Sequence, residues 1–343
     1  MPRPSIASDT NERRALLDAV AGLQNYVSEM KQIAARRRLL YSHMSTRHQR
    51  LAKATGYPRR LQDVDKAVTA NGEITARIAK LAERDFNVTR AELLHSRPVR
   101  NVRVIELLKH FVRDWSDAGN RERSITFPPI LDALQAEFGN DIVQKRVLVP
   151  GAGVGRLAYD ISQLGCQTEA NEYSYLMHLG SIFALEQSKD SCSVYPHVHN
   201  FSHQISGKEQ LRPVTFPDVE PDNRVRLRHS FGDFMKLAGS HNNLYDAVAT
   251  LFFIDTAENM LTYIDTIRQL LPLGGIWINC GPLKWGSSPR VEFTLEEVLS
   301  IISNMGFQIE KRWSKSAEYM ADSEGLWHGF YGVEGWLARK VED

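Results

Sequence analysis

Apolar residues in the first hundred positions recur at the spacing of α-helices. The clearest run of such positions is Leu16, Leu17, Val20 and Leu23. Similar spacing returns near residues 63–83 and 89–95, and glycine and proline are sparse throughout. We therefore expect residues 1–100 to form a helical region.

After residue 145 the pattern changes to short apolar runs that alternate with helical stretches, which is typical of a parallel sheet built from βα units. Seven strands are expected at residues 145–150, 166–171, 225–230, 247–254, 276–279, 307–313 and 329–338. Helices are expected between them at residues 156–164, 173–186, 256–271 and 295–304. The predicted fold class is α/β, with a seven-stranded sheet in residues 101–343.

Residues 188–224 interrupt this alternation. They contain Pro196, Pro213, Pro217 and Pro221 and few periodic positions. Long segments of this kind are uncommon unless they serve a function. Two interpretations stay open. The segment could be a lid over a substrate pocket, or it could be a surface loop without a role in the site.

Composition favours a folded protein that works inside the cell. Hydrophobic residues make up 43% and charged residues 24% of the chain, and the longest apolar run, 247–254, is too short for a membrane span. The three cysteines, Cys166, Cys192 and Cys280, form no CxxC pair, which disfavours a disulfide framework and a structural zinc site. We expect no metal and no membrane, and a cytoplasmic location, with the nucleus as an open alternative.

Charge is balanced overall, with 42 Lys and Arg against 41 Asp and Glu, but one segment departs from that balance. Residues 31–60 contain nine Lys or Arg and no acidic residue. The segment could contact RNA or another anionic partner. A solvated helix face, or one paired with acidic residues elsewhere, is the more common arrangement, so nucleic acid is not the expected partner.

The sharpest local motif follows the strand at 145–150. Gly151, Gly153 and Gly155 form a G-x-G-x-G loop between a buried-type strand and a helix. A dinucleotide fingerprint would need its third glycine at position 156, where the chain has Arg156. The observed spacing matches the loop by which S-adenosylmethionine (SAM) methyltransferases hold the amino acid part of SAM, although a tight structural turn alone would also use glycines.

Acidic residues follow the next two strands. Glu169 and Glu172 both lie near the end of the second strand, and we favour Glu172 for the ribose hydroxyls because ligands bind at the carboxyl ends of strands. Asp233 and Phe234 follow the third strand, where a carboxylate and a ring could meet adenine. An N-cap Asp followed by a core Phe is an equally open interpretation.

Asp255 closes the apolar run of the fourth strand at the same edge of the sheet. There it could orient a nucleophile beside the methyl group. The alternative is that Asp255 caps a helix beginning near Thr256.

With these motifs in view, residues 100–340 resemble the carnosine N-methyltransferase family. The stretches that carry the resemblance are FVRDWS at 111–116, VPGAG at 149–153, NEY at 171–173, FPDV at 216–219, GDF at 232–234, FFIDTA at 252–257 and GGIWIN at 274–279. The resemblance implies the seven-stranded, Rossmann-like sheet of class I methyltransferases behind an N-terminal helical region. It also implies SAM as the cofactor.

The resemblance further implies a set of binding residues. Those implied for SAM are His110, which stands where the family has glutamine, Arg113, Gly151, Gly153, Glu172, Asp233, Phe234 and Leu251. Those implied for the acceptor are Asp255, Tyr319 and Tyr331, while Gly286 stands where the family has a substrate-contacting histidine. A homodimer formed through the helical region is implied as well.

The expected reaction is transfer of a methyl group from SAM to an imidazole nitrogen of carnosine or a related histidine-containing dipeptide, which converts carnosine to anserine. Asp255 is the expected catalytic residue, since a carboxylate can hydrogen-bond the other ring nitrogen and favour the charge that develops on the ring. Two alternatives remain. One is methylation of a protein histidine or a nucleic acid, and the other is a non-catalytic SAM-binding module for assembly.

Overall fold

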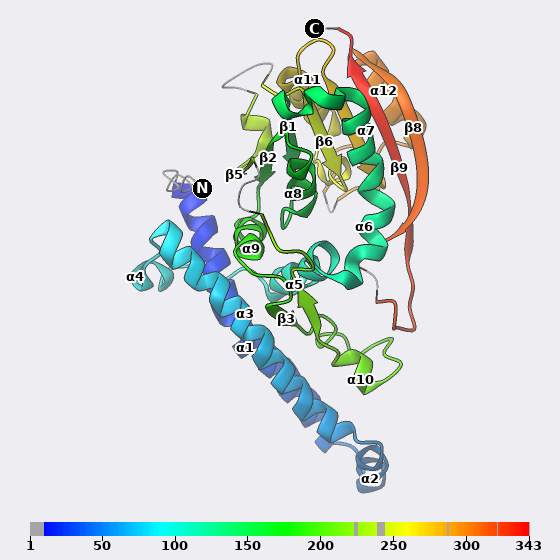
Figure 1. The fold of residues 1–343 in the computed structure, drawn as a ribbon. Coiled ribbons are helices and arrows are strands. Elements are labelled where there is room, and N and C mark those ends of the chain that lie inside the picture. The colour runs from blue at the N-terminus through cyan, green and yellow to red at the C-terminus, as the bar shows by residue number, and fades with distance from the viewer. Residues whose placement is uncertain (1–9, 223–225, 239–243, 287, 321, 343) are drawn as a thin grey trace.

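The computed structural model describes residues 10–222, 226–238, 244–286, 288–320 and 322–342. Its centre is a seven-stranded sheet in the order β5-β2-β1-β6-β7-β9-β8 (Figure 1). The strands are β1 (Arg146–Pro150), β2 (Gln167–Glu172), β5 (Leu227–Phe231), β6 (Ala247–Leu251), β7 (Ile276–Gly281), β8 (Phe307–Glu318) and β9 (Phe330–Lys340). β9 pairs antiparallel with both β7 and β8, and the other pairings in this sheet are parallel. The predicted α/β class and strand number are confirmed.

Alternate residues of the central strands enter two different cores. In β1, Val147 and Val149 pack into one hydrophobic cluster, while Leu148 packs into the other. The β7 residue Trp277 joins Leu148, whereas Ile276 lies on the face of Val147. Side chains of a strand point alternately to its two faces, so a strand buried on both sides reads as one continuous apolar run.

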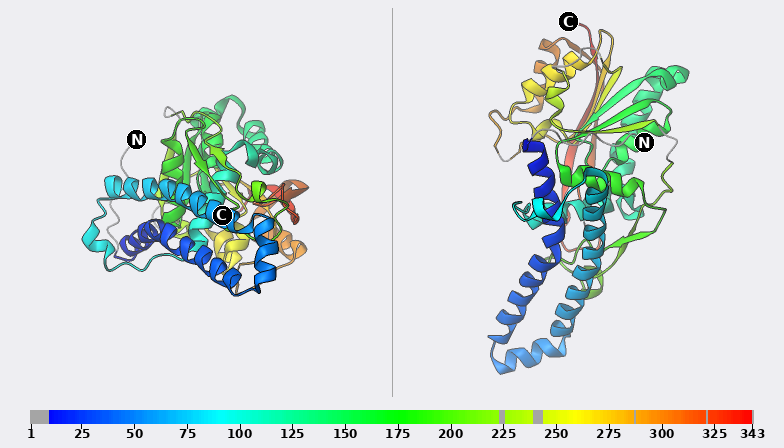
Figure 2. Two further views of the ribbon diagram at one scale, coloured as in Figure 1. Left: turned by 90° about the horizontal axis from the view of Figure 1, so that it is seen from below. Right: turned by 90° about the vertical axis from the view of Figure 1, so that its left-hand side faces the viewer.

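Helices cover both faces of the sheet (Figures 1 and 2). The face of Val147 is covered by α5 (Asn101–Trp115), α7 (Pro128–Phe138), α8 (Arg156–Gln163) and α9 (Tyr175–Leu185). The other face is covered by α11 (Met260–Leu270) and α12 (Leu295–Asn304). The short α6 (Asn120–Thr126) precedes α7 and packs near β8.

The N-terminal segment forms a long helical hairpin that projects beyond the sheet (Figure 2). Its helices are α1 (Thr10–Ser42), α2 (Thr46–Ala54), α3 (Tyr57–Phe86) and α4 (Arg90–Leu93). Leu16, Val20 and Leu23 are buried, and they belong to the same hydrophobic cluster as α5 and α9. The near part of the hairpin therefore shares a core with the sheet, while α2 at the far end buries no residue.

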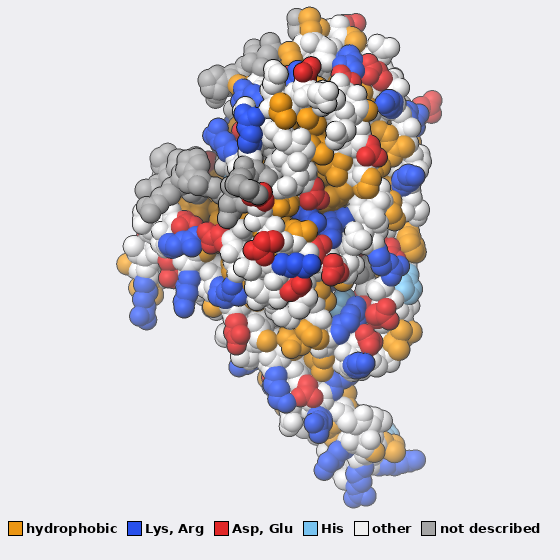
Figure 3. All heavy atoms as spheres, viewed as in Figure 1, with side chains coloured by type: hydrophobic (Ala, Val, Ile, Leu, Met, Phe, Trp, Pro, Cys, Tyr) orange, Lys and Arg blue, Asp and Glu red, His pale blue; other side chains and the backbone are white. Residues whose placement is uncertain are grey.

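The basic segment 31–60 occupies this far end, where Lys and Arg side chains gather (Figure 3). Arg38 pairs with Asp65 of α3 at 2.6 Å, and the guanidinium of Arg37 lies 3.7 Å from the ring centre of Phe201. Arg36, Arg47, Arg50 and Lys53 are exposed. Part of the segment thus pairs within the fold and part faces solvent. None of the described helices is long and apolar enough to cross a membrane.

The segment predicted as an insertion contains a small hairpin of its own. Strands β3 (Cys192–Val194) and β4 (Val214–Phe216) form a two-stranded antiparallel sheet, with α10 (Gly207–Gln210) between them. Phe216 stacks on Phe111 of α5 at 4.6 Å between ring centres. The end of the predicted insertion and Val225, the first residue of the predicted third strand, lie outside the described residues.

Asp218 fastens the returning end of this segment to the body. Its side chain is 7% exposed, and the carboxylate accepts from Arg156 at 2.5 Å and also pairs with Arg123. Its backbone N–H donates to the carbonyl of Trp115 at 2.7 Å. The FVRDWS and FPDV stretches therefore meet each other next to the glycine loop, where the indole N–H of Trp115 donates to Val154 O at 2.8 Å.

Candidate active site

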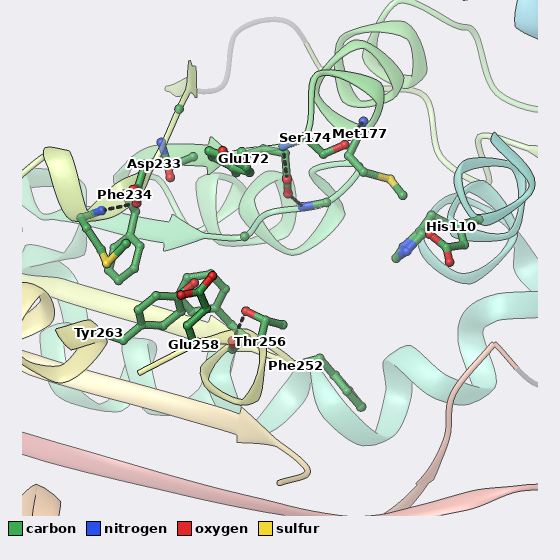
Figure 4. A pocket seen from close by; sticks show the side chains of 18 of the residues that line it. His110, Glu172, Ser174, Met177, Asp233, Phe234, Phe252, Thr256, Glu258 and Tyr263 are labelled. Atoms are coloured by element: carbon green, nitrogen blue, oxygen red, sulfur yellow. Dashed lines mark hydrogen bonds between the residues drawn. The ribbon is translucent and has the colours of Figure 1, made fainter. Parts of the chain in front are cut away.

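A cleft of about 880 Å³ opens at the carboxyl ends of β1, β2, β5 and β6. Figure 4 shows Asp233, Glu172 and Ser174 along one wall and Tyr263, Thr256 and Phe252 along the wall facing it. The volume falls in the range of small-molecule and cofactor sites.

The floor of the cleft is the glycine loop after β1. Gly151 and Gly153 both have positive φ, at 63° and 58°, a region that favours glycine. A Cβ on Gly151 would also lie only 2.3 Å from the ring of Phe253. Above Gly153 the nearest atom to such a Cβ is a guanidinium nitrogen of Arg113, at 3.9 Å. The backbone at Gly151 is thus packed against Phe253, while the backbone at Gly153 is left open to a ligand.

Glu172 is the last residue of β2 and lines the cleft. Its carboxylate accepts hydrogen bonds of 2.8 Å from the backbone N–H groups of Gly153 and Ser174. Burial raises the pKa of this carboxyl above its ordinary value, against the lowering effect of those hydrogen bonds. Glu169, the other candidate on this strand, is buried away from the cleft and accepts from the hydroxyl of Tyr245 at 3.0 Å.

Asp233 and Phe234 both line the cleft, yet each also has a structural contact. Asp233 caps the short 3₁₀ turn after β5, accepting from the N–H of Met235 at 3.0 Å. Phe234 is 3% exposed, and its ring packs edge-on against Phe253 and Tyr263 at 5.1 and 4.8 Å. Asp233 therefore caps the turn, as one interpretation of the sequence proposed, and it also lies on the cleft wall.

One end of the cleft is formed by α5, which presents His110. Burial and the nearby charge of Arg113 lower the pKa of His110 to about 4, despite the opposing effect of Asp114. The imidazole is therefore neutral at neutral pH. Arg113 makes a two-pronged pair with Asp114 at 2.6 and 2.9 Å, and its guanidinium lies 5.4 Å from the ring centre of Tyr319.

Asp255 lies in a 3₁₀ turn, Ile254–Thr256, which begins three residues after the end of β6. The helix-capping alternative is wrong, because α11 begins at Met260 and its cap is Asn259. Instead the buried carboxylate of Asp255 accepts from the backbone N–H of Lys284 at 3.0 Å. Burial raises its pKa to about 6, although that hydrogen bond acts in the opposite direction.

The other residues implied for the acceptor form a connected series with Asp255. The N–H of Gly286 donates to the carbonyl of Asp255 at 3.0 Å. The ammonium of Lys284 lies 6.0 Å from the ring centre of Tyr331, and that ring lies 6.2 Å from the ring of Tyr319. The series therefore ends at Tyr319, on the cleft wall.

The structure thus divides the twelve residues singled out from the sequence into two groups. Those that line the cleft are His110, Gly151, Gly153, Glu172, Asp233, Phe234 and Tyr319. Those that do not are Arg113, Leu251, Asp255, Gly286 and Tyr331. Arg113 and Leu251 instead line a cavity of about 10 Å³ that shares Phe252 with the cleft.

The cleft also has lining residues that sequence reasoning missed. They include Arg103, Glu106, Met177, Glu258, Tyr263 and Arg290. For Arg103 and Glu106 a signal existed, because they precede His110 by seven and four positions on one face of a helix. Tyr263 and Arg290 carried no such local signal.

The sequence of this chain is similar to those of known proteins over most of its length. The family model described as carnosine N-methyltransferase matches residues 91–342. The chain belongs to the carnosine N-methyltransferase family. It is accordingly a SAM-dependent methyltransferase.

Two curated members of this family illustrate the extent of the similarity. The carnosine N-methyltransferase of Schizosaccharomyces pombe is 32% identical over 96% of this chain and 97% of its own length. The rat carnosine N-methyltransferase is 36% identical over 68% of this chain and 62% of its own length. A solved magnesium protoporphyrin IX methyltransferase from Synechocystis matches with a TM-score of 0.41 and 13% identity, over 71% of this chain and 89% of that one, which is too distant to add to the assignment.

Proposed function

We propose that this protein transfers the methyl group of SAM to an imidazole nitrogen of carnosine or a related histidine-containing dipeptide, so that carnosine becomes anserine. The observation that carries the proposal is the position of Asp255. A buried carboxyl with a raised pKa stands in the turn that follows β6, connected through Lys284, Tyr331 and Tyr319 to the cleft. Perturbed carboxyl groups beside a cleft are candidates for work on a proton.

The residues of the cleft fit SAM. Gly151 and Gly153 both line the cleft, and Gly153 leaves the loop backbone uncovered for the amino acid part. The carboxylates of Glu172 and Asp233 can accept from ribose hydroxyls and from the adenine amine. SAM supplies a methyl group on a positively charged sulfur, which a neutral nitrogen lone pair can attack. The neutral imidazole of His110 adds no positive charge to this end of the cleft.

The acceptor needs orientation more than activation. Imidazole has an ordinary pKa near 6.5, so most of it carries a free lone pair at neutral pH. Holding the reacting atoms in position can contribute roughly 7 to 11 kcal/mol in favourable cases. We assign Asp255 the hydrogen bond from the other ring nitrogen, which fixes the tautomer and favours the charge that develops on the ring.

Tyr319 and Tyr331 are proposed as the walls of the acceptor site, with Gly286 beside Asp255. A Cβ built on Gly286 would have its nearest neighbours, the carbonyl oxygens of Asp255 and Thr256, at 3.8 Å. The space that the family fills with a histidine is therefore available here.

The test is to incubate the purified protein with methyl-labelled SAM and carnosine, beside free histidine and a histidine-containing peptide, and to identify the products by mass. Methylated carnosine supports the proposal. Transfer only to the longer peptide would move the acceptor to a protein histidine. SAM binding without transfer to any acceptor would favour a non-catalytic role.

We also propose that the chain forms a homodimer through its helical N-terminal region. The support is a group of exposed apolar side chains near the far end of the hairpin, Leu39, Leu40, Met44 and Leu51. Light scattering on the full chain tests it. Replacing Leu39 and Leu51 with Lys should yield a monomer if this surface is the interface, and an unchanged mass would place the interface elsewhere.

A further inference from the structure

Three charged or polar side chains connect the 188–224 segment to the turn between β8 and β9. Asp322 of that turn faces His197 and Arg212. The Nδ1 of His197 lies 3.1 Å from Oδ2 of Asp322, and Arg212 pairs with Oδ1 of the same carboxylate. An Nη2 of Arg212 also lies 2.8 Å from Nε2 of His197. Each of the three groups therefore contacts the other two.

The hydrogen bonds of this triad are satisfied by a neutral imidazole. Arg212 can only donate, so Nε2 of His197 accepts from it, and Nδ1 carries the proton that is donated to Asp322. Burial and the charge of Arg212 lower the pKa of His197, against the raising effect of Asp322. The side chains of His197, Arg212 and Asp322 are only 13, 22 and 17% exposed, which limits screening by solvent.

The backbones of the two segments are also joined. The N–H of Leu326 donates to the carbonyl of His203 at 2.8 Å, and Gln204 forms an isolated antiparallel bridge with Gly325. Figure 1 shows the β8–β9 connection coming down beside α10. Side-chain and backbone contacts thus act on the same turn.

The segment that holds the turn is itself fixed to the body. Its returning end is held by the buried pair of Asp218 with Arg156. Nearer its start, the side chain of Asn71 in α3 bonds both the carbonyl and the N–H of Tyr195, at 3.0 and 2.7 Å. A segment anchored at both ends can transmit its position to what it contacts in the middle.

The turn matters because its first residues reach the cleft. Tyr319 and Met320 line the cleft just before Asp322, and Tyr331 follows the turn at the start of β9. The ring of Tyr319 packs against that of Phe252 at 4.9 Å between centres. Loosening the turn would leave both ends of the β8–β9 connection free to shift at the acceptor side.

We infer that His197, Arg212 and Asp322 form a clasp by which the 188–224 segment positions Tyr319 and Tyr331 for the methyl acceptor. The inference rests on the proposed function for the identity of that acceptor. It assigns the three residues as positioning residues, which act through the two tyrosines. It also gives the 188–224 segment a specific task, holding the wall of the acceptor site.

The experiment compares Asp322→Asn, Arg212→Gln and the double variant with a control, Glu324→Gln, in the full chain. Asn keeps the shape of Asp322 and can still accept from the N–H of Glu324, which lies 3.2 Å from Oδ1. Glu324 lies in the same turn, but its carboxylate is exposed and bonds only to Ser323 among the contacts described, at 3.5 Å. Hydrogen exchange of the Leu326 amide, SAM affinity, and KM and kcat for carnosine are measured.

We expect Asp322→Asn to speed exchange at Leu326 and to raise the KM for carnosine about tenfold, as for the loss of one charged hydrogen bond, with kcat and SAM affinity within about twofold. Arg212→Gln should act alike, and the double variant should add little to either. The control should match the wild type. If the three residues had only a structural role, the variants would be less stable, but KM would not rise while kcat stayed the same.

Two results would overturn the clasp. Unchanged exchange at Leu326 in both single variants would show that the turn is held without it, whatever the activities. Faster exchange with an unchanged KM would show that the turn does not position the acceptor. A wild-type enzyme that binds SAM but leaves carnosine unmodified contradicts the proposed function instead, and the exchange result still decides whether the clasp exists.

Discussion

The carboxylate of Glu172 accepts a 2.8 Å hydrogen bond from the backbone N–H of Gly153, across the turn that joins β1 to α8. The contact joins the glycine loop to the end of the neighbouring strand. It holds a half-buried carboxyl group, whose pKa is raised by its burial, at the cleft wall. Two features found separately in the sequence are therefore one unit in the fold.

Replacing Glu172 with Gln should weaken SAM binding about tenfold or more, because hydrogen bonds to a charged group contribute roughly 1.5 to 3 kcal/mol. The amide would also turn a donor toward N–H groups. Calorimetric titration with SAM measures the change. The matched control is Glu169→Gln on the same strand, whose side chain lies away from the cleft and should leave the affinity unchanged. Equal affinities of wild type and Glu172→Gln would remove Glu172 from the SAM site.

Asp255→Asn should lower kcat for carnosine by about a hundredfold, within the range for a group that acts on a proton, and leave SAM affinity nearly intact. Because the pKa of Asp255 is raised to about 6, its carboxylate is mostly ionised at pH 7 and protonates below pH 6. The ratio of wild-type to variant kcat should therefore fall as the pH drops through 6. The acceptor's own titration affects both proteins and cancels in this ratio. A ratio that is independent of pH would contradict the assigned role.

The same carboxyl group should make stability depend on pH. Its folded pKa of about 6 exceeds the ordinary value of 3.8, so its contribution is fully present below 3.8 and is lost as the pH rises through 6. A shift of this size corresponds to about 3 kcal/mol. Between about pH 4 and pH 7 the free energy of unfolding of Asp255→Asn should therefore rise relative to that of the wild type. Urea unfolding measures the difference. A constant difference between the two proteins would mean that Asp255 is not desolvated as the structure shows.

Local motifs in the sequence were enough to predict the strand, the glycine turn and the helix that form the floor of the cleft. The strand predicted at 145–150 is β1, Arg146–Pro150, and the helix predicted at 156–164 is α8, Arg156–Gln163. Buried apolar runs and glycine turns depend on neighbours in the chain, so periodicity detects them. Glu172 was preferred over Glu169 for another reason, its place at the carboxyl end of the strand, and of the two it is Glu172 that lines the cleft.

Features that depend on contacts between distant parts of the chain were harder to predict from the sequence. The helix predicted from 256 begins at Met260, because a 3₁₀ turn at Ile254–Thr256 follows Phe252, which has a positive φ of 50°. The strand predicted at 307–313 extends to Glu318, since its outer half is polar and is defined by pairing with β9. The three-residue strands β3 and β4 were too short to show a period.

Restoring a histidine at Gly286 should improve the use of carnosine. The position has an ordinary φ and its nearest neighbours are 3.8 Å from a built Cβ, so a side chain can begin there without strain. Gly286→His should lower the KM for carnosine about tenfold through one added hydrogen bond to the acceptor, while Gly286→Ala should leave it unchanged. Steady-state kinetics with carnosine compares the two. If both variants raise the KM equally, the space beside Gly286 is needed by the acceptor and no imidazole belongs there.

Asp218 should be among the most sensitive positions for stability. Asp218→Asn removes a negative charge that two buried guanidinium groups share, those of Arg123 and Arg156. Breaking a buried ion pair from one side costs about 3 to 5 kcal/mol, because the remaining charge stays desolvated. Asp160→Asn, which removes the more exposed partner of Arg156, should cost about 1 kcal/mol. Urea unfolding at neutral pH measures the free energy of unfolding of both variants. Equal losses would show that the pair of Asp218 with Arg123 adds nothing to stability. The expected excess at Asp218 follows from geometry: one carboxylate bonds two helices, α6 and α8, and at the same time carries the returning end of the 188–224 segment.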